Sequence, residues 1–358
     1  MKIAIGYDLK PNSWGGGNQF ANSLANEAMA RGHEVTFNLK DKDIDLILLT
    51  DPRSFNDGIT FGPSQILKYI LFNKRTIVVH RINECDERKN TFHMNKLLKC
   101  ANYFSDHTVF ISKYLKKLDI YQKDLPSSVI YNGCDEKYFN CKNNSLWNKK
   151  YPLKIVTHHW SPNKMKGFDV YAKIDQLINE TDLANKIEFT YIGNLPKGFT
   201  FKKIKHLAPL SGKDLGIELS KNHVYLTASI NEPAGMHHIE GALSGLPIIY
   251  RNSGAIPEYC SDFGVSFNDS EVVNSIETMI LEYDKYKLKL KNYPYTASKM
   301  TSEYLYLFDD LISNRDKIIQ KRNLFRSPFY LFMNLVITVF YIKKPIRIFK
   351  KFIRKNLL

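Results

Sequence analysis

The residues best suited to chemistry lie in the segment 231–247, where Glu232 and Glu240 stand eight positions apart. A carboxylate accepts hydrogen bonds from vicinal hydroxyl groups, such as those of a ribose or a hexose. Pro233 and Gly235 break the chain between them, so a turn followed by a helix is expected here. The free N–H groups at a helix start attract an anion such as a diphosphate. The segment therefore predicts a site for a sugar that is joined to phosphate.

These residues need a scaffold, and the rest of the chain alternates apolar runs with helical patterns. Strands are predicted at 2–9, 34–39, 44–50, 76–80, 108–111 and 128–131, and again at 153–157, 187–192, 224–228, 247–250 and 264–267. Continuous Val, Ile and Leu runs separated by helices indicate parallel sheets covered on both faces. The sequence therefore predicts an α/β protein with two doubly wound sheets, which bind ligands at the carboxyl ends of their strands.

The length of 358 residues favours two domains, and 44% hydrophobic with 24% charged residues is an ordinary globular composition. The polar segment 140–151 reads as a linker. We therefore expect an N-terminal domain over 1–150, a C-terminal domain over 151–314 and a tail over 315–358. The last helix of the second domain, expected at 297–313, could cross back to the first.

The tail carries 12 Lys and Arg and one Asp, whereas the other 314 residues have a net charge of only +4. Apolar residues recur in it at helical spacing, at Ile342, Ile346, Phe349, Ile353 and Leu357. A stripe of this kind opposite basic residues is typical of a helix on an anionic membrane surface. Alternatively, the apolar part packs on the body and leaves a solvated basic arm. A nucleic-acid partner is not expected, because the basic charge is confined to the tail.

Three features bear on the compartment. The first residues lead directly into a strand, so no signal peptide is expected. The five cysteines are scattered and odd in number, which favours free thiols in a reducing compartment. No segment offers about 20 uninterrupted apolar residues, the length of a membrane span. We expect a cytoplasmic protein that is peripheral on the inner face of the cell membrane.

The segment around the two carboxylates resembles the donor-binding signature of family 4 (group 1) glycosyltransferases. After Glu240 it continues with Ala-Leu-Ser-Gly-Leu-Pro, and then with Ser-Gly-Ala-Ile-Pro-Glu at 253–258. The order of other elements also matches the family: three glycines at 15–17 before a helix, Arg-Gly-His-Glu-Val at 31–35, Tyr-Asn-Gly-Cys-Asp at 131–135 and Lys-Gly at 166–167.

The resemblance implies the GT-B fold, in which two Rossmann-like domains face a cleft, and sugar transfer with retained anomeric configuration and no metal. It implies that Glu240 binds the donor ribose, that Glu232 binds the transferred sugar and that Lys166 binds the diphosphate. Gly16 and Gly17 would close over the donor from the other domain. The expected donor site also includes Gly235, Met236, His237 and Ser253.

One position departs from the family pattern. An Arg usually stands several residues before the Lys-Gly element, and the segment 158–167 contains none. Lys164 or Arg251 could supply the second positive charge, although a lysine lacks the bidentate fork of a guanidinium. The departure leaves open a non-catalytic sugar-binding module.

His80 and Arg81 end a predicted strand, and residues at that position face the crevice in a doubly wound sheet. We expect His80 to be catalytic, together with Glu232 and Lys166, and Arg81 to contact the acceptor or the sugar. The alternative is an ordinary loop in which Arg81 pairs with a nearby acid.

Two aromatic side chains are further candidates for sugar contact. His159 follows a strand, and contact with the donor competes there with structural packing. Its neighbour His158 should point to the opposite face of the strand, so the pair is not expected to bind a metal. Trp14, beside the three glycines, could stack on a sugar or anchor the loop.

The sequence therefore predicts a hexosyltransferase of cell-surface polysaccharide synthesis, which moves a sugar from a nucleotide-sugar to a glycan or lipid-linked acceptor. No cofactor and no metal are expected. A nucleotide-sugar epimerase of the same fold is the alternative enzyme.

Overall fold

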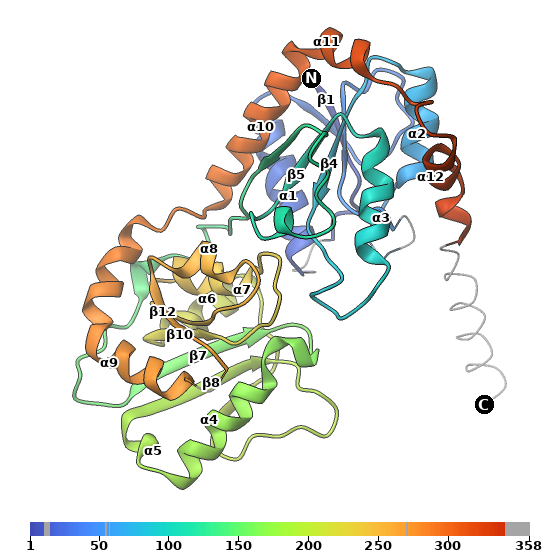
Figure 1. Ribbon diagram of the computed structural model, residues 1–358. Coiled ribbons are helices and arrows are strands. Elements are labelled where there is room, and N and C mark those ends of the chain that lie inside the picture. The colour runs from blue at the N-terminus through green and yellow to red at the C-terminus, as the bar shows by residue number, and fades with distance from the viewer. Residues whose placement is uncertain (11–14, 54–55, 57, 270, 341–358) are drawn as a thin grey trace, which may run out of the picture.

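The structure is a computed structural model that describes residues 1–10, 15–53, 56, 58–269 and 271–340. Trp14 lies outside the described residues, and so does the apolar stripe of the tail from Ile342 to Leu357. In the described part, the chain forms two six-stranded sheets with helices on their faces (Figure 1). All strand pairs in both sheets are parallel.

The first sheet has the strand order β2-β1-β3-β4-β5-β6. Its strands are β1 (Lys2–Ile5), β2 (Glu34–Thr36), β3 (Leu46–Leu49), β4 (Ile77–Ile82), β5 (His107–Phe110) and β6 (Ser127–Val129). Helices α1 (Gly15–Ala30), α2 (Pro63–Phe72) and α3 (Met94–Ala101) accompany it. Alternate residues of β3 enter separate cores: Leu46 and Leu48 pack with Phe20 of α1, whereas Ile47 and Leu49 pack with α2. Both faces of the sheet are therefore covered, as its continuous apolar strands predict.

The second sheet has the strand order β12-β11-β10-β7-β8-β9. Its strands are β7 (Leu153–His159), β8 (Ile187–Gly193), β9 (Lys205–Leu207), β10 (Val224–Thr227), β11 (Ile248–Arg251) and β12 (Gly264–Phe267). Its helices are α4 (Phe168–Glu180), α5 (Leu183–Lys186), α6 (Gly212–Ser220), α7 (His237–Leu243), α8 (Ile256–Cys260) and α9 (Val272–Lys289). The edge strand β9 has no counterpart among the predicted strands, because its three residues, Lys-His-Leu, form no apolar run.

After α9 the chain returns to the first sheet, where α10 (Ala297–Ser313) packs against α1 (Figure 1). Phe20 and Tyr304 meet edge to face, with ring centroids 5.1 Å apart. Helices α11 (Arg315–Lys321) and α12 (Pro328–Phe340) follow, and α12 packs against α2. Short 3₁₀ helices complete the path: η1 (Asn102–Phe104), η2 (Leu115–Lys117), η3 (Cys141–Asn143), η4 (Lys164–Lys166) and η5 (Leu290–Asn292).

The described start of the tail is held on the first sheet by its arginines. Arg315 pairs with Asp45 at 2.6 Å, and Arg322 pairs with the buried Asp106 at 2.5 Å. The Arg326 guanidinium lies 4.6 Å from the centre of the Tyr103 ring. This part of the tail therefore packs on the body of the protein. Within the described residues, none of the helices combines the length and apolarity needed to span a bilayer.

The two sheets are joined by hydrogen bonds that converge on Glu258 of α8. Its carboxylate accepts from the backbone N–H groups of Lys113 and Tyr114, at 2.7 and 2.6 Å, and from the Tyr131 hydroxyl at 3.0 Å. The Tyr259 hydroxyl adds a bond to the Ile111 carbonyl at 2.7 Å. These contacts hold the carboxyl ends of the two sheets against one another.

Candidate functional site

A pocket of about 310 Å³ lies between the two sheets and is lined by both halves of the chain. The first half contributes 15–17 and Gln19 at the start of α1, together with residues that follow β4, β5 and β6. The second half contributes the ends of β7 and β8, Lys166 and the loop 232–237 with the start of α7. The pocket thus occupies the crevice at the strand carboxyl ends, as expected for doubly wound sheets.

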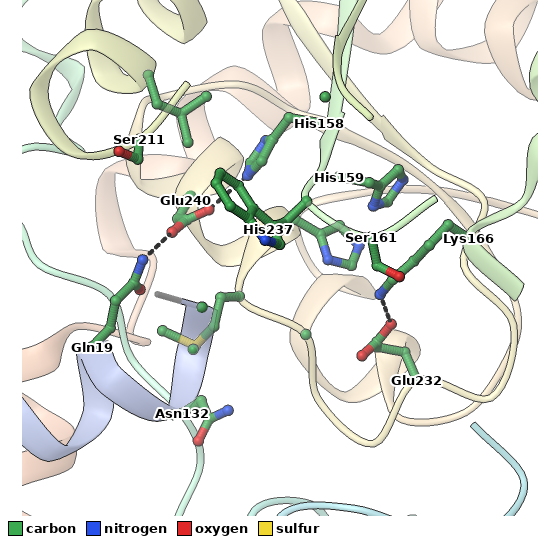
Figure 2. A pocket seen from close by; sticks show the side chains of 18 of the residues that line it. Gln19, Asn132, His158, His159, Ser161, Lys166, Ser211, Glu232, His237 and Glu240 are labelled. Carbon is green, nitrogen blue, oxygen red and sulfur yellow. Dashed lines mark hydrogen bonds and ion pairs between the residues drawn. The ribbon is translucent and has the colours of Figure 1, made fainter. Parts of the chain in front are cut away.

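Glu240, on α7, joins the two halves across this pocket (Figure 2). Gln19 Nε2, from α1, donates a hydrogen bond to Glu240 Oε1 at 3.2 Å. On the other side, His158 Nε2 lies 2.7 Å from Glu240 Oε2. The carboxylate is buried, yet both of its oxygens have polar partners in the pocket wall. Each carboxylate oxygen can accept more than one hydrogen bond, so Glu240 can also accept hydrogen bonds from a ligand that enters the pocket.

Glu232 precedes the turn into α7 and is held between two cations. Lys166 Nζ contacts Glu232 Oε2, and Arg88 Nε, from the first half of the chain, lies 3.2 Å from Glu232 Oε1. Burial alone would raise the pKa of Glu232, but the charges of Lys166 and Arg88 outweigh it and lower the pKa to about 2. The carboxylate is consequently ionised at neutral pH.

Lys166 ends η4, and its position depends on the glycine after it. Gly167 has φ +88°, a left-handed conformation that a side chain disfavours. A Cβ atom at this position would also lie 2.3 Å from the Ala228 carbonyl oxygen. Burial lowers the pKa of Lys166, and the neighbouring Glu232 opposes this effect by stabilising the ammonium. The loop therefore holds one lysine against one carboxylate at the floor of the pocket.

Three buried histidines lie near Lys166, and two of them, His159 and His237, line the pocket. The pKa values of His159 and His237 lie well below the ordinary value, and that of His238 falls to about 3, in each case mainly through burial. His159 Nε2 lies 2.7 Å from the Tyr171 hydroxyl, and His237 Nε2 lies 2.8 Å from the Thr227 hydroxyl. These rings are neutral at pH 7, and those of His159 and His237 give the pocket a polar, uncharged wall. Among the described residues, no group of three or more His, Cys, Asp or Glu side chains is arranged to hold a metal ion.

The three glycines form the first turn of α1, and Gly16 approaches the second half of the chain closely. A Cβ atom on Gly16 would lie 2.7 Å from Met236 Cγ, and one on Gly17 would lie 3.1 Å from the Tyr7 hydroxyl. The absence of a side chain at Gly16 therefore allows the first turn of α1 to reach the loop that precedes α7. Met236 also accepts a hydrogen bond at its carbonyl from Cys134 Sγ, at 3.6 Å.

The structure places most of the predicted site residues in this one pocket. They are Gly16, Gly17, Arg81, His159, Lys166, Glu232, Gly235, Met236, His237 and Glu240. Four others, His80, Lys164, Arg251 and Ser253, do not line it.

The predicted catalytic role of His80 is wrong, because the strand that contains it is longer than the sequence indicated. The strand β4 continues to Ile82, so His80 lies inside it and not at its end. Its side chain is 0% exposed, and its Nδ1 atom faces Asn102 Oδ1 at 3.2 Å. Because neighbouring residues on a strand point to opposite faces, only Arg81 reaches the pocket. His80 is part of the core.

The two cations considered for the missing arginine also lie elsewhere. Lys164 is exposed on η4. Arg251 is buried and pairs with Asp169 at 2.7 Å and with Asp269 at 3.1 Å. Ser253 has a supporting place, because its hydroxyl accepts a hydrogen bond from the Asn231 backbone N–H at 2.9 Å. Arg251 and Ser253 therefore stabilise the loops around the pocket from outside it.

Arg88, Gln19 and His158 are pocket residues that the sequence reasoning did not assign to the site. Arg88 lies in a charged run after β4 and belongs to no motif. Gln19 is one of several polar residues on α1. His158 lines the pocket beside His159 because β7 ends there, so that both rings reach the opening. Arg88 and Gln19 are identified only by their contacts across the cleft, with Glu232 and Glu240.

The fold is the GT-B architecture, in which two Rossmann-like domains face one cleft. One similar solved structure is Anabaena Alr3699/HepE in complex with UDP and glucose, with 14% identity, a TM-score of 0.62, and coverage of 87% of this chain and 100% of that chain. Another is the sucrose-phosphate synthase of Thermosynechococcus elongatus, with 13% identity, a TM-score of 0.62, and coverage of 87% and 99%. No protein-family model and no curated protein matches the chain.

Proposed function

We propose that this protein is a glycosyltransferase that moves a sugar from a nucleotide-sugar donor to an acceptor. The observation that carries the proposal is the convergence of Glu232, Glu240 and Lys166 on one pocket in the cleft of a GT-B fold. Alr3699/HepE, which shares this fold, has been crystallised with UDP and glucose and with UDP-glucose. A nucleotide-sugar is therefore the class of ligand proposed for this pocket.

In the proposed complex, the donor ribose binds at Glu240 and the diphosphate binds at Lys166. The acceptor hydroxyl oxygen bonds to the anomeric carbon, the bond from that carbon to the diphosphate breaks, and the hydroxyl proton is released. Negative charge grows on the departing nucleoside diphosphate, where Lys166 and Arg88 stabilise it. Positive charge grows at the anomeric carbon, near the Glu232 carboxylate. The proposal includes retention of anomeric configuration and catalysis without a metal.

The proposed acceptor is a glycan or a lipid-linked sugar at the inner face of the cell membrane. Support comes from α12, whose outer side carries the exposed aromatic residues Phe329 and Phe332, at 66% and 59% exposure. Phe72, at the end of the helix against which α12 packs, is 88% exposed. The strongly basic segment 341–358 follows α12 directly. Aromatic side chains beside basic ones favour an anionic membrane interface.

The test of the function begins with a thermal-shift screen of nucleoside diphosphates and their sugars against the full-length protein. A stabilising nucleotide-sugar is then incubated with and without acceptor glycans, and the products are separated. We expect Glu240→Gln to lower donor affinity by about tenfold or more, because a carboxylate binds hydroxyl donors more strongly than a neutral amide.

The products distinguish the alternatives. A new glycosidic product that depends on the acceptor supports the proposal, and EDTA should leave its rate unchanged. A converted nucleotide-sugar formed without acceptor identifies an epimerase. Donor binding with neither transfer nor hydrolysis identifies a sugar-binding module. Unchanged transfer by Glu240→Gln contradicts the proposed donor site.

A further inference from the structure

A second pocket, of about 180 Å³, opens beside the first in the N-terminal half of the chain. It lies where β1, β3 and β4 end, between Tyr7 and the residues that follow β3 and β4. Four residues line both pockets: Gly17, Arg81, Asn83 and Arg88. The two pockets therefore meet, and a ligand in the second can reach a sugar bound in the first.

The second pocket has more positive than negative side chains in its wall, and both of its carboxylates are already paired. Asp51 accepts hydrogen bonds from Arg53 Nη2 at 2.6 Å and from Arg53 Nε at 2.8 Å. Glu84 accepts from Lys89 Nζ at 2.9 Å and from Arg88 Nη1 at 3.2 Å. Neither carboxylate needs a further cation, so any other positive charge in this wall is in excess.

Arg81 is that excess charge. It is only 2% exposed, and its guanidinium packs 3.8 Å from the centre of the Phe20 ring. One Nη atom donates to Asn132 Oδ1 at 2.9 Å, but Nε has no hydrogen-bond partner in the described part of the chain. No carboxylate of the described residues lies within ion-pair distance of it. A buried guanidinium without a counter-charge is costly, and an anionic ligand would remove that cost.

The rest of the wall fits a sugar. The Tyr7 hydroxyl stays protonated, because burial raises its pKa, and the Asn83 side chain carries an amide. Both groups can exchange hydrogen bonds with sugar hydroxyls. A guanidinium fork matches the two oxygens of a carboxylate or of a phosphate ester. Arg81 therefore adds selectivity for charge to a site that is otherwise suited to neutral sugars.

We propose that the second pocket binds the acceptor and selects one that carries an oxyanion, a sugar carboxylate or a phosphate ester, with Arg81 as its counter-charge. This inference rests on the proposed function. The anion would lie in the second pocket, and the acceptor hydroxyl would point through the junction toward the donor sugar. Both kinds of acceptor present a pair of negatively charged oxygens to Arg81. The experiment below distinguishes a sugar carboxylate from a phosphate ester.

The test measures binding of three probes, D-glucuronate, D-glucose 6-phosphate and D-glucose, to the full-length protein by ligand-observed NMR. Saturating UDP, or the nucleotide found in the screen, fills the first pocket during these measurements. We expect at least one charged probe to bind about tenfold more tightly than glucose, because hydrogen bonds between charged groups are the stronger kind. A preference for glucuronate identifies a carboxylate acceptor, and a preference for glucose 6-phosphate identifies a phosphorylated one.

Two variants and a control connect that preference to the pocket. Arg81→Met should reduce binding of the charged probe to the level of glucose. Asn83→Asp keeps the size of a half-buried side chain and places a negative charge at the same junction, so it should weaken binding of the charged probe more than binding of glucose, even where Arg81→Met fails to fold. Lys68→Met removes an exposed cation of α2 that lines neither pocket and should leave the preference intact.

Equal binding of all three probes by the unmodified protein overturns the inference, and so does an unchanged preference in both Arg81→Met and Asn83→Asp. Failure of the proposed function looks different, because the unmodified protein would then bind no nucleotide and form no product. The nucleotide screen and the probe titrations therefore report on the two proposals separately.

Discussion

At the scale of single residues, one carboxylate forms ion pairs with cations from both halves of the chain. Glu232 contacts Lys166 from its own domain and Arg88 from the other. Arg88 is thus the guanidinium that stands beside Lys166, although it comes from a segment far from the Lys-Gly element. If the protein has the proposed function, a bound diphosphate would pair with both Lys166 and Arg88, because its negative charge exceeds that of one carboxylate.

This arrangement predicts a phosphate-specific effect of Arg88. Replacement of Arg88 by Ala should weaken UDP binding by about tenfold while uridine binding changes little, because the guanidinium forms charge-assisted bonds with phosphate only. Calorimetric titration of both ligands gives the comparison. Lys89→Ala, which removes the neighbouring cation, should bind UDP like the unmodified protein. An equal loss for UDP and uridine would show that Arg88 acts on the pocket as a whole.

His80 leads to a prediction about acid stability. Burial lowers its pKa in the folded protein to about 4, so the unfolded chain takes up a proton more readily between about pH 6.5 and pH 4. The stability contributed by the neutral ring is present above pH 6.5 and is lost as the pH falls. The slope for one histidine is about 1.4 kcal/mol per pH unit. The free energy of unfolding, obtained from urea titrations, should fall less steeply between pH 6.5 and pH 4 in His80→Gln than in the unmodified protein, by the slope of about one proton. An identical slope in the two proteins would refute this prediction.

At the scale of elements, the first turn of α1 meets the loop before α7, and their close contact depends on the absence of a side chain at Gly16. Gly16→Ala would place a Cβ atom 2.7 Å from Met236 Cγ. Because Met236 must then move, we expect nucleotide affinity to fall by roughly tenfold, in line with the cost of about 1–3 kcal/mol for overpacking.

A second substitution tests whether the loss of nucleotide affinity in Gly16→Ala is caused by the steric clash with Met236. Met236→Ala removes the atom that a Cβ on Gly16 would strike, so the double variant Gly16→Ala/Met236→Ala should bind better than the sum of the two single losses predicts. The same nucleotide titration measures all four proteins. Additive losses would mean that the start of α1 and the loop before α7 do not act through this contact.

At the scale of the whole molecule, the start of the tail packs on the first sheet, which also forms one wall of the cleft. Helices α10, α11 and α12 all return to the first sheet after the second sheet is complete (Figure 1). The basic end of the chain is thereby attached to the domain proposed to bind the acceptor. A membrane contact through the tail would hold that domain, and the second pocket with it, near a lipid-linked acceptor.

The membrane proposal predicts binding that depends on lipid charge. The protein should sediment with vesicles that contain anionic phosphatidylglycerol and remain in solution with phosphatidylcholine alone, because each basic residue near an anionic surface contributes about 1 kcal/mol. Removal of 341–358 should abolish sedimentation, and Phe329→Ser/Phe332→Ser should weaken it severalfold. Leu281→Ser, an exposed apolar residue on α9, is the matched control. Equal sedimentation with both kinds of vesicle contradicts the proposal.

The sequence by itself determined the two parallel sheets, because apolar strand runs and helical periodicity are local patterns. It also located Glu232, Glu240 and Lys166, whose neighbours form recognisable motifs. Only the tertiary structure decided which groups face them. The pairing of Arg88 with Glu232 and of Gln19 with Glu240 arises where the two domains dock, and no local pattern encodes that contact. The burial of His80 was decided in the same way, because two more residues of strand pairing moved it from the crevice into the core.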